Sequence, residues 1–356
     1  MAQRRKTRTV TVGDVKIGSD YPVSIQSMTK TDTRDVDATV SEIHALEAAG
    51  CEIVRSAVKD SASAKALSAI RKRITIPLVA DIHFDYKLAL LVIKGGIDKI
   101  RINPGNIYEP GEVNAIIDEA HEAGIPIRIG INSGSLRKSS SPSESEADEM
   151  VSSALRYLEL FRKKDFNDLV ISLKSASCET TVAAYRRIAA ECDYPLHLGV
   201  TAAGLPEDGI VRSSIGIGTL LVDGIGDTVR VSLTGDPVEE VGVAKRILST
   251  VGMREFGHEI ISCPTCGRCQ VDLVSIVKEL EVELKKKSQL SDDEDKQLTI
   301  AIMGCEVNGP GEAMNADIGI AFGSGKGAIF RRGEIIKTVK VDSAIRELLD
   351  IINEES

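Results

Sequence analysis

One theme recurs eight times between residues 24 and 233 of this 356-residue chain: a short β-branched run, a loop, and then apolar residues at helical spacing. The runs are SIQSMT (24–29), IVRSAV (53–58), LVADIHF (78–84), KIRIN (99–103), IRIGIN (127–132), LVISLK (169–174), LHLGVT (196–201) and DTVRVS (227–232). Eight strand–helix units predict an α/β fold of the (β/α)8 TIM-barrel type, with its chemistry at the C-terminal ends of the strands. A doubly wound sheet is the alternative, which is less favoured because no GxGxxG follows an early strand.

A different pattern begins near residue 255. After EIISCPTCGRC, the spacing of apolar residues predicts an amphipathic helix with a stripe formed by Val274, Val277, Leu280 and Leu284. The runs TIAIMGC and ADIGIAF predict strands, and AIFRRGEIIKTVKV predicts a hairpin that turns at Gly333 before a last helix. We therefore predict a barrel domain over residues 1–255 and a small α+β domain over residues 256–356.

The overall charge and composition argue against several classes of function. A formal net charge of -9 at pH 7 disfavours binding to nucleic acid or to an anionic membrane, and the absence of Trp with 3% aromatic residues disfavours a base-stacking platform. The sequence contains no apolar run of about 18 residues, and its basic N-terminus lacks the apolar segment of a secretory signal. We expect a cytoplasmic protein that binds neither nucleic acid nor membrane.

Positive charge converges on the predicted barrel mouth. Residues two apart share one face of a strand, so the valines of DTVRVS take one face and the polar residues the other. The same parity places five cations on five strands, with three polar neighbours: Arg55, Arg101, Arg128, Lys174 and Arg230, with Asn103, Asn132 and Ser232. Any one of these cations is readily explained by a nearby carboxylate, but five together need a compensating anion. Because guanidinium groups suit phosphate oxygens, we infer a ligand with more than one phosphate charge.

His83 has the strand parity of Asp81 and is a candidate for the same mouth. A single histidine is more often structural than catalytic, so this candidate rests on its position alone.

Three of the seven cysteines stand close together in CPTCGRC. This spacing fits a structural zinc site with Cys263, Cys266, Cys269 and Cys305. A ferredoxin-type cluster is a second reading, but the motif lacks the fourth cysteine and proline of that pattern. The third reading is an iron–sulfur cluster held by three cysteines and one ligand that is not cysteine.

The motifs together resemble one family. CPTCGRC is followed by GCEVNGPGE, and the barrel part carries QSMT, ADIHF, RINPGN, HLGVT and GDTVRVSLT. Over nearly its full length the chain is similar to the bacterial two-domain 4-hydroxy-3-methylbut-2-enyl diphosphate synthases. The resemblance implies a [4Fe-4S] cluster in the small domain, held by Cys263, Cys266, Cys305 and Glu312. It makes Cys269 a non-ligand and favours Glu312 over Glu306, which spacing alone also allows.

The resemblance also implies an activity. Members of the family reductively open 2-C-methyl-D-erythritol 2,4-cyclodiphosphate to 4-hydroxy-3-methylbut-2-enyl diphosphate, with two electrons from flavodoxin or ferredoxin. The five cations, Asn103, Asn132 and Ser232 would hold this cyclic diphosphate, and the barrel would be the substrate-binding domain. A homodimer is implied as well, because in relatives the small domain of one protomer covers the barrel of the other.

One position departs from the family pattern. Where the family reads HLGVTEAG, this chain reads HLGVTAAG, so Ala202 replaces the glutamate regarded as the acid/base, directly after the matching Thr201. The loss of a general acid/base typically costs about 10²- to 10⁴-fold in rate. Either His83 or water substitutes, or turnover is impaired. Two rival readings are a simple electron carrier, which would need no cationic mouth, and a zinc- or cluster-containing phosphate-binding protein without turnover.

Overall fold

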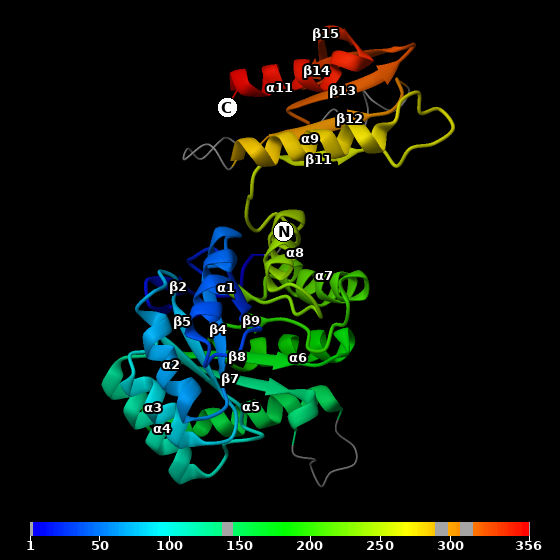
Figure 1. Cartoon of the computed structure of the whole chain (residues 1–356). Coiled ribbons are helices and arrows are strands. Elements are labelled where there is room, and N and C mark those ends of the chain that lie inside the picture. The colour runs from blue at the N-terminus through cyan, green and yellow to red at the C-terminus, as the bar shows by residue number, and fades with distance from the viewer. Residues whose placement is uncertain (1–2, 137–144, 289–297, 307–315, 356) are drawn as a thin grey trace. The chain divides into compact units, whose positions relative to one another are not determined.

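The computed structural model describes residues 3–136, 145–288, 298–306 and 316–355. The chain divides into two compact units, residues 1–254 and 255–356 (Figure 1). In the described segments, no helix combines the length and the apolar character that crossing a bilayer requires.

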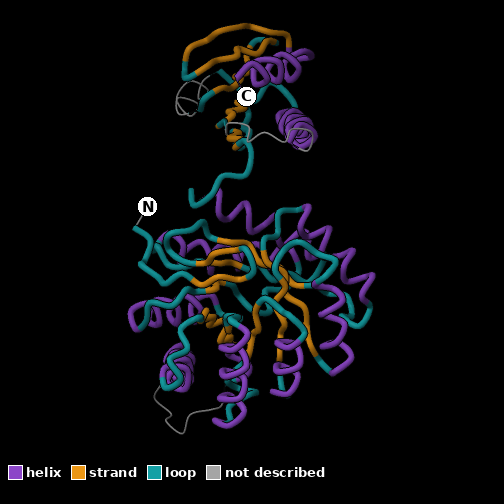
Figure 2. The backbone as a smooth tube through the Cα atoms, turned by 90° about the vertical axis from the view of Figure 1, so that its left-hand side faces the viewer, coloured by secondary structure: helices purple, strands orange, loops and turns teal. Residues whose placement is uncertain are grey.

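The first unit is built around eight parallel strands that follow one another around a barrel (Figure 2). The strands are β3 (Ser24–Met28), β4 (Ile53–Val58), β5 (Leu78–Ile82), β6 (Lys99–Ile102), β7 (Ile127–Asn132), β8 (Leu169–Lys174), β9 (His197–Leu198) and β10 (Thr228–Val229). Their order in the sheet is β8-β7-β6-β5-β4-β3-β10-β9, and a parallel bridge between Ile171 and Leu196 joins the two ends. The predicted TIM-barrel fold is therefore confirmed, with each strand inside one of the eight predicted runs.

Eight helices surround this barrel and cover the outer faces of the strands (Figure 2). They are α1 (Val36–Ala48), α2 (Ser61–Arg71), α3 (Tyr86–Lys94), α4 (Pro110–Ala123), α5 (Glu146–Arg162), α6 (Cys178–Glu191), α7 (Pro206–Val222) and α8 (Pro237–Thr250). Side-chain caps define where several of them start: Asp35, Asp60 and Asp85 each accept a hydrogen bond from a backbone N–H of the first turn. These caps fix where each loop at the C-terminal ends of the strands stops.

A short antiparallel hairpin, β1 (Val10–Val12) and β2 (Val15–Ile17), closes the other end of the barrel. Val12 and Ile17 are fully buried against Ile53 and Val79, which lie near the starts of their strands. Because apolar side chains fill this end, the C-terminal ends of the strands are left for a binding site.

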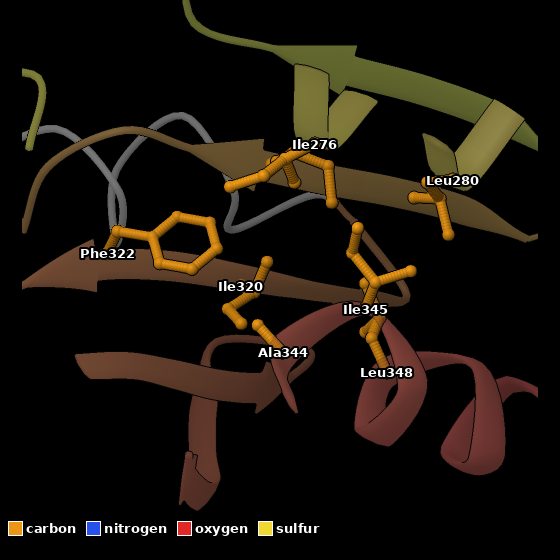
Figure 3. Close-up of a pocket in the computed structure, with 8 residues that line it drawn as sticks. Ile276, Leu280, Ile320, Phe322, Ala344, Ile345 and Leu348 are labelled. Carbon is orange, nitrogen blue, oxygen red and sulfur yellow. The ribbon is translucent and has the colours of Figure 1, made fainter. Parts of the chain in front are cut away.

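Among its described residues, the second unit has a five-stranded mixed sheet and two helices whose side chains pack with the sheet in one hydrophobic core. Its elements are β11 (Glu259–Ser262), α9 (Leu273–Ser288), β12 (Thr299–Met303), β13 (Ile318–Gly323), β14 (Lys326–Arg331), β15 (Glu334–Lys340) and α11 (Ala344–Glu355). Leu280 from α9 and Leu348 from α11 meet Ile320 and Phe322 of β13 in its core (Figure 3). The predicted turn at Gly333 joins β14 to β15, where its φ of 84° suits glycine.

Two details of this unit differ from the sequence expectations. The side chain of Val274 is 56% exposed, whereas Leu273 is buried. The predicted Val277, Leu280 and Leu284 do pack against the core, and Leu273, the first residue of the helix, takes the place of Val274. The strand β11 was not expected, and it brings the CPTCGRC motif directly to the end of the sheet.

Candidate active site

The C-terminal ends of the barrel strands surround a cavity of about 130 Å³. All five predicted cations line it, together with Asn132, Ser232, Thr201 and His83. Two lining residues were not predicted, Asp81 and Ser172. The alternation of side chains along each strand therefore places the polar set inside the barrel, as the parity argument required.

Asp81 binds three groups of this cavity from the end of β5. Its carboxylate lies 3.1 Å from Arg101 Nη1, 3.6 Å from Arg55 Nε and 3.3 Å from His83 Nε2. Burial alone would raise the pKa of Asp81, but Arg55 and Arg101 hold it well below its usual range. Burial lowers the pKa of Arg55 to about 10, against the opposing effect of Asp81. This carboxylate therefore stays ionised and fixes the guanidinium groups on either side.

A second buried carboxylate, Glu240, reaches the barrel from helix α8. Arg230 Nη2 lies 3.2 Å from its Oε2, and Lys30 Nζ lies 3.1 Å from its Oε1. The backbone N–H of Leu233 donates to the same carboxylate at 3.0 Å. Glu240 thus holds Arg230 at the rim and ties it to the loop that follows β10.

Arg128 has no carboxylate contact among the interactions of the described residues. Its Nη1 donates to Gln26 Oε1 at 2.7 Å, and its Nε has no hydrogen-bond partner, as is also true of Arg101 Nε and Arg230 Nε. Burial, with Arg55 and Arg101 nearby, holds the pKa of Arg128 well below its usual value. Unmatched buried donors of this kind are costly unless a ligand supplies acceptors.

Lys174 lies at the end of β8 beside a histidine that the sequence reasoning missed. Its Nζ is 3.1 Å from Nε2 of His197, which is fully buried at the start of β9. Lys99 was missed as well, although it shares the inward face of β6 with Arg101 and is 1% exposed. The parity rule that found Arg101 also predicts Lys99, one layer deeper in the barrel.

Two glycines make room for the cations. An added Cβ at Gly130 would lie 2.4 Å from Arg101 Nε, and one at Gly199 would lie 2.5 Å from Lys174 Nζ. Arg101 Nη2 also donates to the carbonyl oxygen of Gly130 at 2.8 Å. Each long side chain therefore lies directly against the bare backbone of a neighbouring strand.

Two of the site residues predicted in the barrel, Asn103 and Ala202, do not line the cavity. Asn103 is buried, and its side chain donates to Ser135 Oγ and accepts from the N–H of Gly105, both at 2.9 Å. Its hydrogen bonds therefore shape the loop after β6. Ala202 follows the lining residue Thr201 and is exposed, in the left-handed region with a φ of 50°.

The cysteine motif of the second unit folds over the end of strand β12. The backbone N–H of Gly304 lies 3.3 Å from Cys263 Sγ, and the N–H of Gln270 donates to the carbonyl oxygen of Gly304 at 3.0 Å. Cys305 follows Gly304 directly and is buried, whereas Cys266 is exposed. The predicted thiol ligands are thus carried by the ends of two paired strands, β11 and β12.

Cys269 lies beside the same glycine, since an added Cβ at Gly304 would be 2.4 Å from Cys269 Sγ. All seven cysteines belong to described segments and none forms a disulfide. Glu312 lies outside the described residues, and within them no three His, Cys, Asp or Glu side chains are close enough to hold a metal ion. The available donors are thiols, which are ligands of both iron–sulfur clusters and structural zinc sites.

Comparisons with known proteins cover nearly the whole chain. Residues 7–245 match the family described as the GcpE TIM-barrel domain, and residues 259–354 match the GcpE protein C-terminal domain. A 4-hydroxy-3-methylbut-2-en-1-yl diphosphate synthase (flavodoxin) of Clostridium perfringens is 53% identical over 98% of this chain and 99% of the relative. The protein of the same name from Geobacter sulfurreducens is 50% identical over 99% of both chains.

Solved structures support the barrel independently. The dihydropteroate synthase of Stenotrophomonas maltophilia superposes with a TM-score of 0.52 at 13% identity, over 70% of this chain and all of that chain. The enzyme from Vibrio fischeri gives 0.51 at 13% identity, over 68% of this chain and 98% of that chain. At this identity the likeness concerns the fold alone.

Proposed function

The chain belongs to the GcpE family of 4-hydroxy-3-methylbut-2-en-1-yl diphosphate synthases, iron–sulfur oxidoreductases of isoprenoid biosynthesis, and from this premise we propose how its parts share the reaction. The barrel binds 2-C-methyl-D-erythritol 2,4-cyclodiphosphate, and the small domain, residues 256–356, holds the electron-transfer centre. Flavodoxin delivers the electrons, a role supported by the names of the relatives. The working protein is a cytoplasmic homodimer.

The observation that carries the substrate assignment is the cationic mouth. Arg55, Arg101 and Arg230 are oriented by two buried carboxylates, while Arg128 and Lys174 have no carboxylate contact among the described residues. The substrate carries two negatively charged phosphoryl groups, whose oxygens accept the hydrogen bonds that Nε of Arg101, Arg128 and Arg230 otherwise lack. Asn132 and Ser232 contribute neutral donors to the same ligand, and Asn103 shapes the loop behind them.

We assign the cluster to Cys263, Cys266, Cys305 and Glu312, with Cys269 as a neighbour that does not ligate it. When bound, a [4Fe-4S] cluster supplies electrons one at a time and leaves one iron with a weak oxygen ligand. The three thiols belong to one end of the sheet, and the backbone N–H of Gly304 lies within reach of Cys263 Sγ. An N–H directed at a ligating sulfur stabilises its negative charge.

The overall reaction adds two electrons, opens the ring at a carbon–oxygen bond to phosphate, and removes one hydroxyl group as water. The hydroxyl needs a proton as it leaves, and Ala202 cannot give one. His83 is placed to do so, because Asp81 holds its imidazole at 3.3 Å and both residues line the mouth with Thr201. We therefore propose slow turnover with His83 as the proton donor.

The test is anaerobic turnover of the cyclodiphosphate by the cluster-loaded chain with flavodoxin or a chemical reductant, with product identified by mass spectrometry. Slow formation of 4-hydroxy-3-methylbut-2-enyl diphosphate is expected. A brown protein that binds the substrate without ever forming product would refute the catalytic assignment in favour of a binding protein. A colourless protein that contains zinc would refute the cluster assignment.

A further inference from the structure

Lys174 and His197 form a buried pair in the wall of the mouth. The lysine is 7% exposed, the histidine is fully buried, and their nitrogen atoms lie 3.1 Å apart. On its other side, His197 Nδ1 lies 3.5 Å from Thr228 Oγ1, and the hydroxyl of Tyr185 donates to the His197 carbonyl oxygen. Within the described part of the chain, no hydrogen bond or ion pair of these two side chains involves a carboxylate.

The charged groups that act most strongly on the pair come from several strands around the barrel and are positive. They are Arg128 on β7, Arg230 after β10, Arg55 on β4, and Lys99 and Arg101 on β6. Of the buried carboxylates of the barrel, Asp81 and Glu240 contact arginines and Lys30 at the mouth, and Asp227 contacts Arg4. The empty mouth therefore contains more positive charge than its own carboxylates neutralise.

Arginine does not release its proton in proteins, whereas a lysine amine and an imidazole do. Burial, followed by the four nearby arginines, holds the pKa of Lys174 well below its ordinary value. Burial and then Lys174 lower the pKa of His197 in the same direction. The pKa of Lys99 is lowered by burial and by Arg128 and Arg55 as well, but only Lys174 lines the cavity, so Lys174 is the amine whose charged form a bound anion would favour.

We propose that the Lys174–His197 pair takes up one proton from solvent when the doubly charged cyclodiphosphate enters the mouth. The inference rests on the proposed function, since it uses that ligand. The proton adds to the lone pair of Lys174 Nζ, which then donates to a phosphoryl oxygen and to His197 Nε2. His197 remains neutral, with the N–H on Nδ1 directed at Thr228 Oγ1. The pocket thereby adjusts its charge to that of its ligand.

Proton uptake makes binding depend on pH in a defined direction. Because the bound state holds the additional proton, affinity falls as pH rises, by about tenfold per pH unit between the pKa values of the empty and occupied states. Below the pKa of the empty state, Lys174 is already charged and the affinity no longer changes for this reason.

The experiment is isothermal titration calorimetry of the cluster-loaded, oxidised full chain with the cyclodiphosphate, under anaerobic conditions at pH 8. Parallel titrations in Hepes and Tris, which both buffer at this pH and differ in ionisation enthalpy, give the number of protons taken up. We expect about one proton per bound ligand. The Lys174→Arg variant keeps a permanent charge, so it is expected to bind without proton uptake. The Lys99→Met variant is the matched control for a buried lysine, and uptake is expected to remain.

Several results would overturn the inference. Unchanged uptake in Lys174→Arg would place the proton elsewhere, and uptake lost in Lys99→Met but kept in Lys174→Arg would assign it to Lys99. Lys174→Gln provides a second neutral variant, expected to bind weakly and without uptake, and circular dichroism establishes that each variant folds. A chain that does not bind the cyclodiphosphate gives no binding heat in either buffer, which refutes the proposed function as well. Binding heat that is equal in both buffers refutes only the proton uptake.

Discussion

Replacing Ala202 by glutamate is expected to raise turnover of the cyclodiphosphate by about 10²- to 10⁴-fold, the usual contribution of a positioned general acid/base. The residue directly follows Thr201, which lines the mouth, and its side chain is exposed. A glutamate carboxyl there can move between the cavity and solvent without the desolvation that burial would impose. The gain should therefore come in kcat, since the cations that bind the diphosphate are unchanged.

The same substitution should leave stability nearly unchanged. Ala202 already has a φ of 50°, and this conformation costs about 1–2 kcal/mol for any residue that carries a Cβ. Alanine and glutamate bear that cost alike, so the free energy of unfolding should change by less than about 0.5 kcal/mol. Urea denaturation of both chains measures this directly and separates a catalytic gain from a gain in folded protein.

The assay compares kcat of the unchanged chain, Ala202→Glu and Ala202→Gln at equal iron content and saturating substrate, without oxygen. Glutamine has the shape of glutamate but no ionisable proton, so only the glutamate variant should gain activity. In the unchanged chain, His83→Gln should abolish the residual turnover, whereas in Ala202→Glu it should cost much less. Equal kcat in all three chains would refute the reasoning that position 202 limits the rate.

Three further substitutions test the scaffold of the two sites. Glu240→Ala leaves two cations unpaired at the rim, so it should lower the free energy of unfolding by about 3–5 kcal/mol, as measured by urea denaturation. The pKa of Asp81 in the folded protein lies below its value in the unfolded chain. The ionised carboxylate therefore stabilises the fold above about pH 4, and this stabilisation is lost as pH falls towards the folded pKa. In Asp81→Asn, the melting temperature should therefore fall less steeply with decreasing pH in this range. Gly304→Ala should displace Cys269, whose sulfur lies 2.4 Å from the added Cβ, and lower iron incorporation after anaerobic reconstitution, whereas Gly267→Ala has open space and should not.

Each of these results can contradict its premise. A stability loss below about 1 kcal/mol for Glu240→Ala would mean that water compensates the exposed cations. An unaltered fall of the melting temperature with decreasing pH in Asp81→Asn would show that other carboxylates set the acid stability. Equal iron content in both glycine variants would show that the Gly304 backbone does not shape the cluster loop.

Local sequence patterns were sufficient to predict the barrel and most of its mouth. Each β-branched run became one strand, and the alternation of side chains placed Arg101 and Arg128 inside, because both properties depend only on neighbours in sequence. Lys99 obeys the same rule but was not predicted, and it lies at the start of its strand, one layer below the residues that line the cavity.

The partners of the cations could not be read from the sequence. Glu240 reaches Arg230 from a helix, and His197 faces Lys174 across two neighbouring strands, so both pairings depend on tertiary packing. The amide of Asn103 has the parity of a mouth residue, but it hydrogen-bonds Gly105 in its own loop and Ser135 in the loop after β7. The alternation of residues along a strand shows which side chains face the mouth, but it does not show whether such a side chain hydrogen-bonds a nearby loop or a ligand.

The close approach of Arg101 to Gly130 and of Lys174 to Gly199 constrains how the sequence of this mouth can evolve. Each cationic side chain fills the space in which a side chain on the glycine would lie, so a methyl group at either glycine would displace the cation. A replacement of the cation by a shorter residue would in turn leave a hole beside the glycine. Neither the glycine nor its cation can therefore be substituted alone without a cost. A change in ligand preference at this mouth would require paired substitutions on adjacent strands.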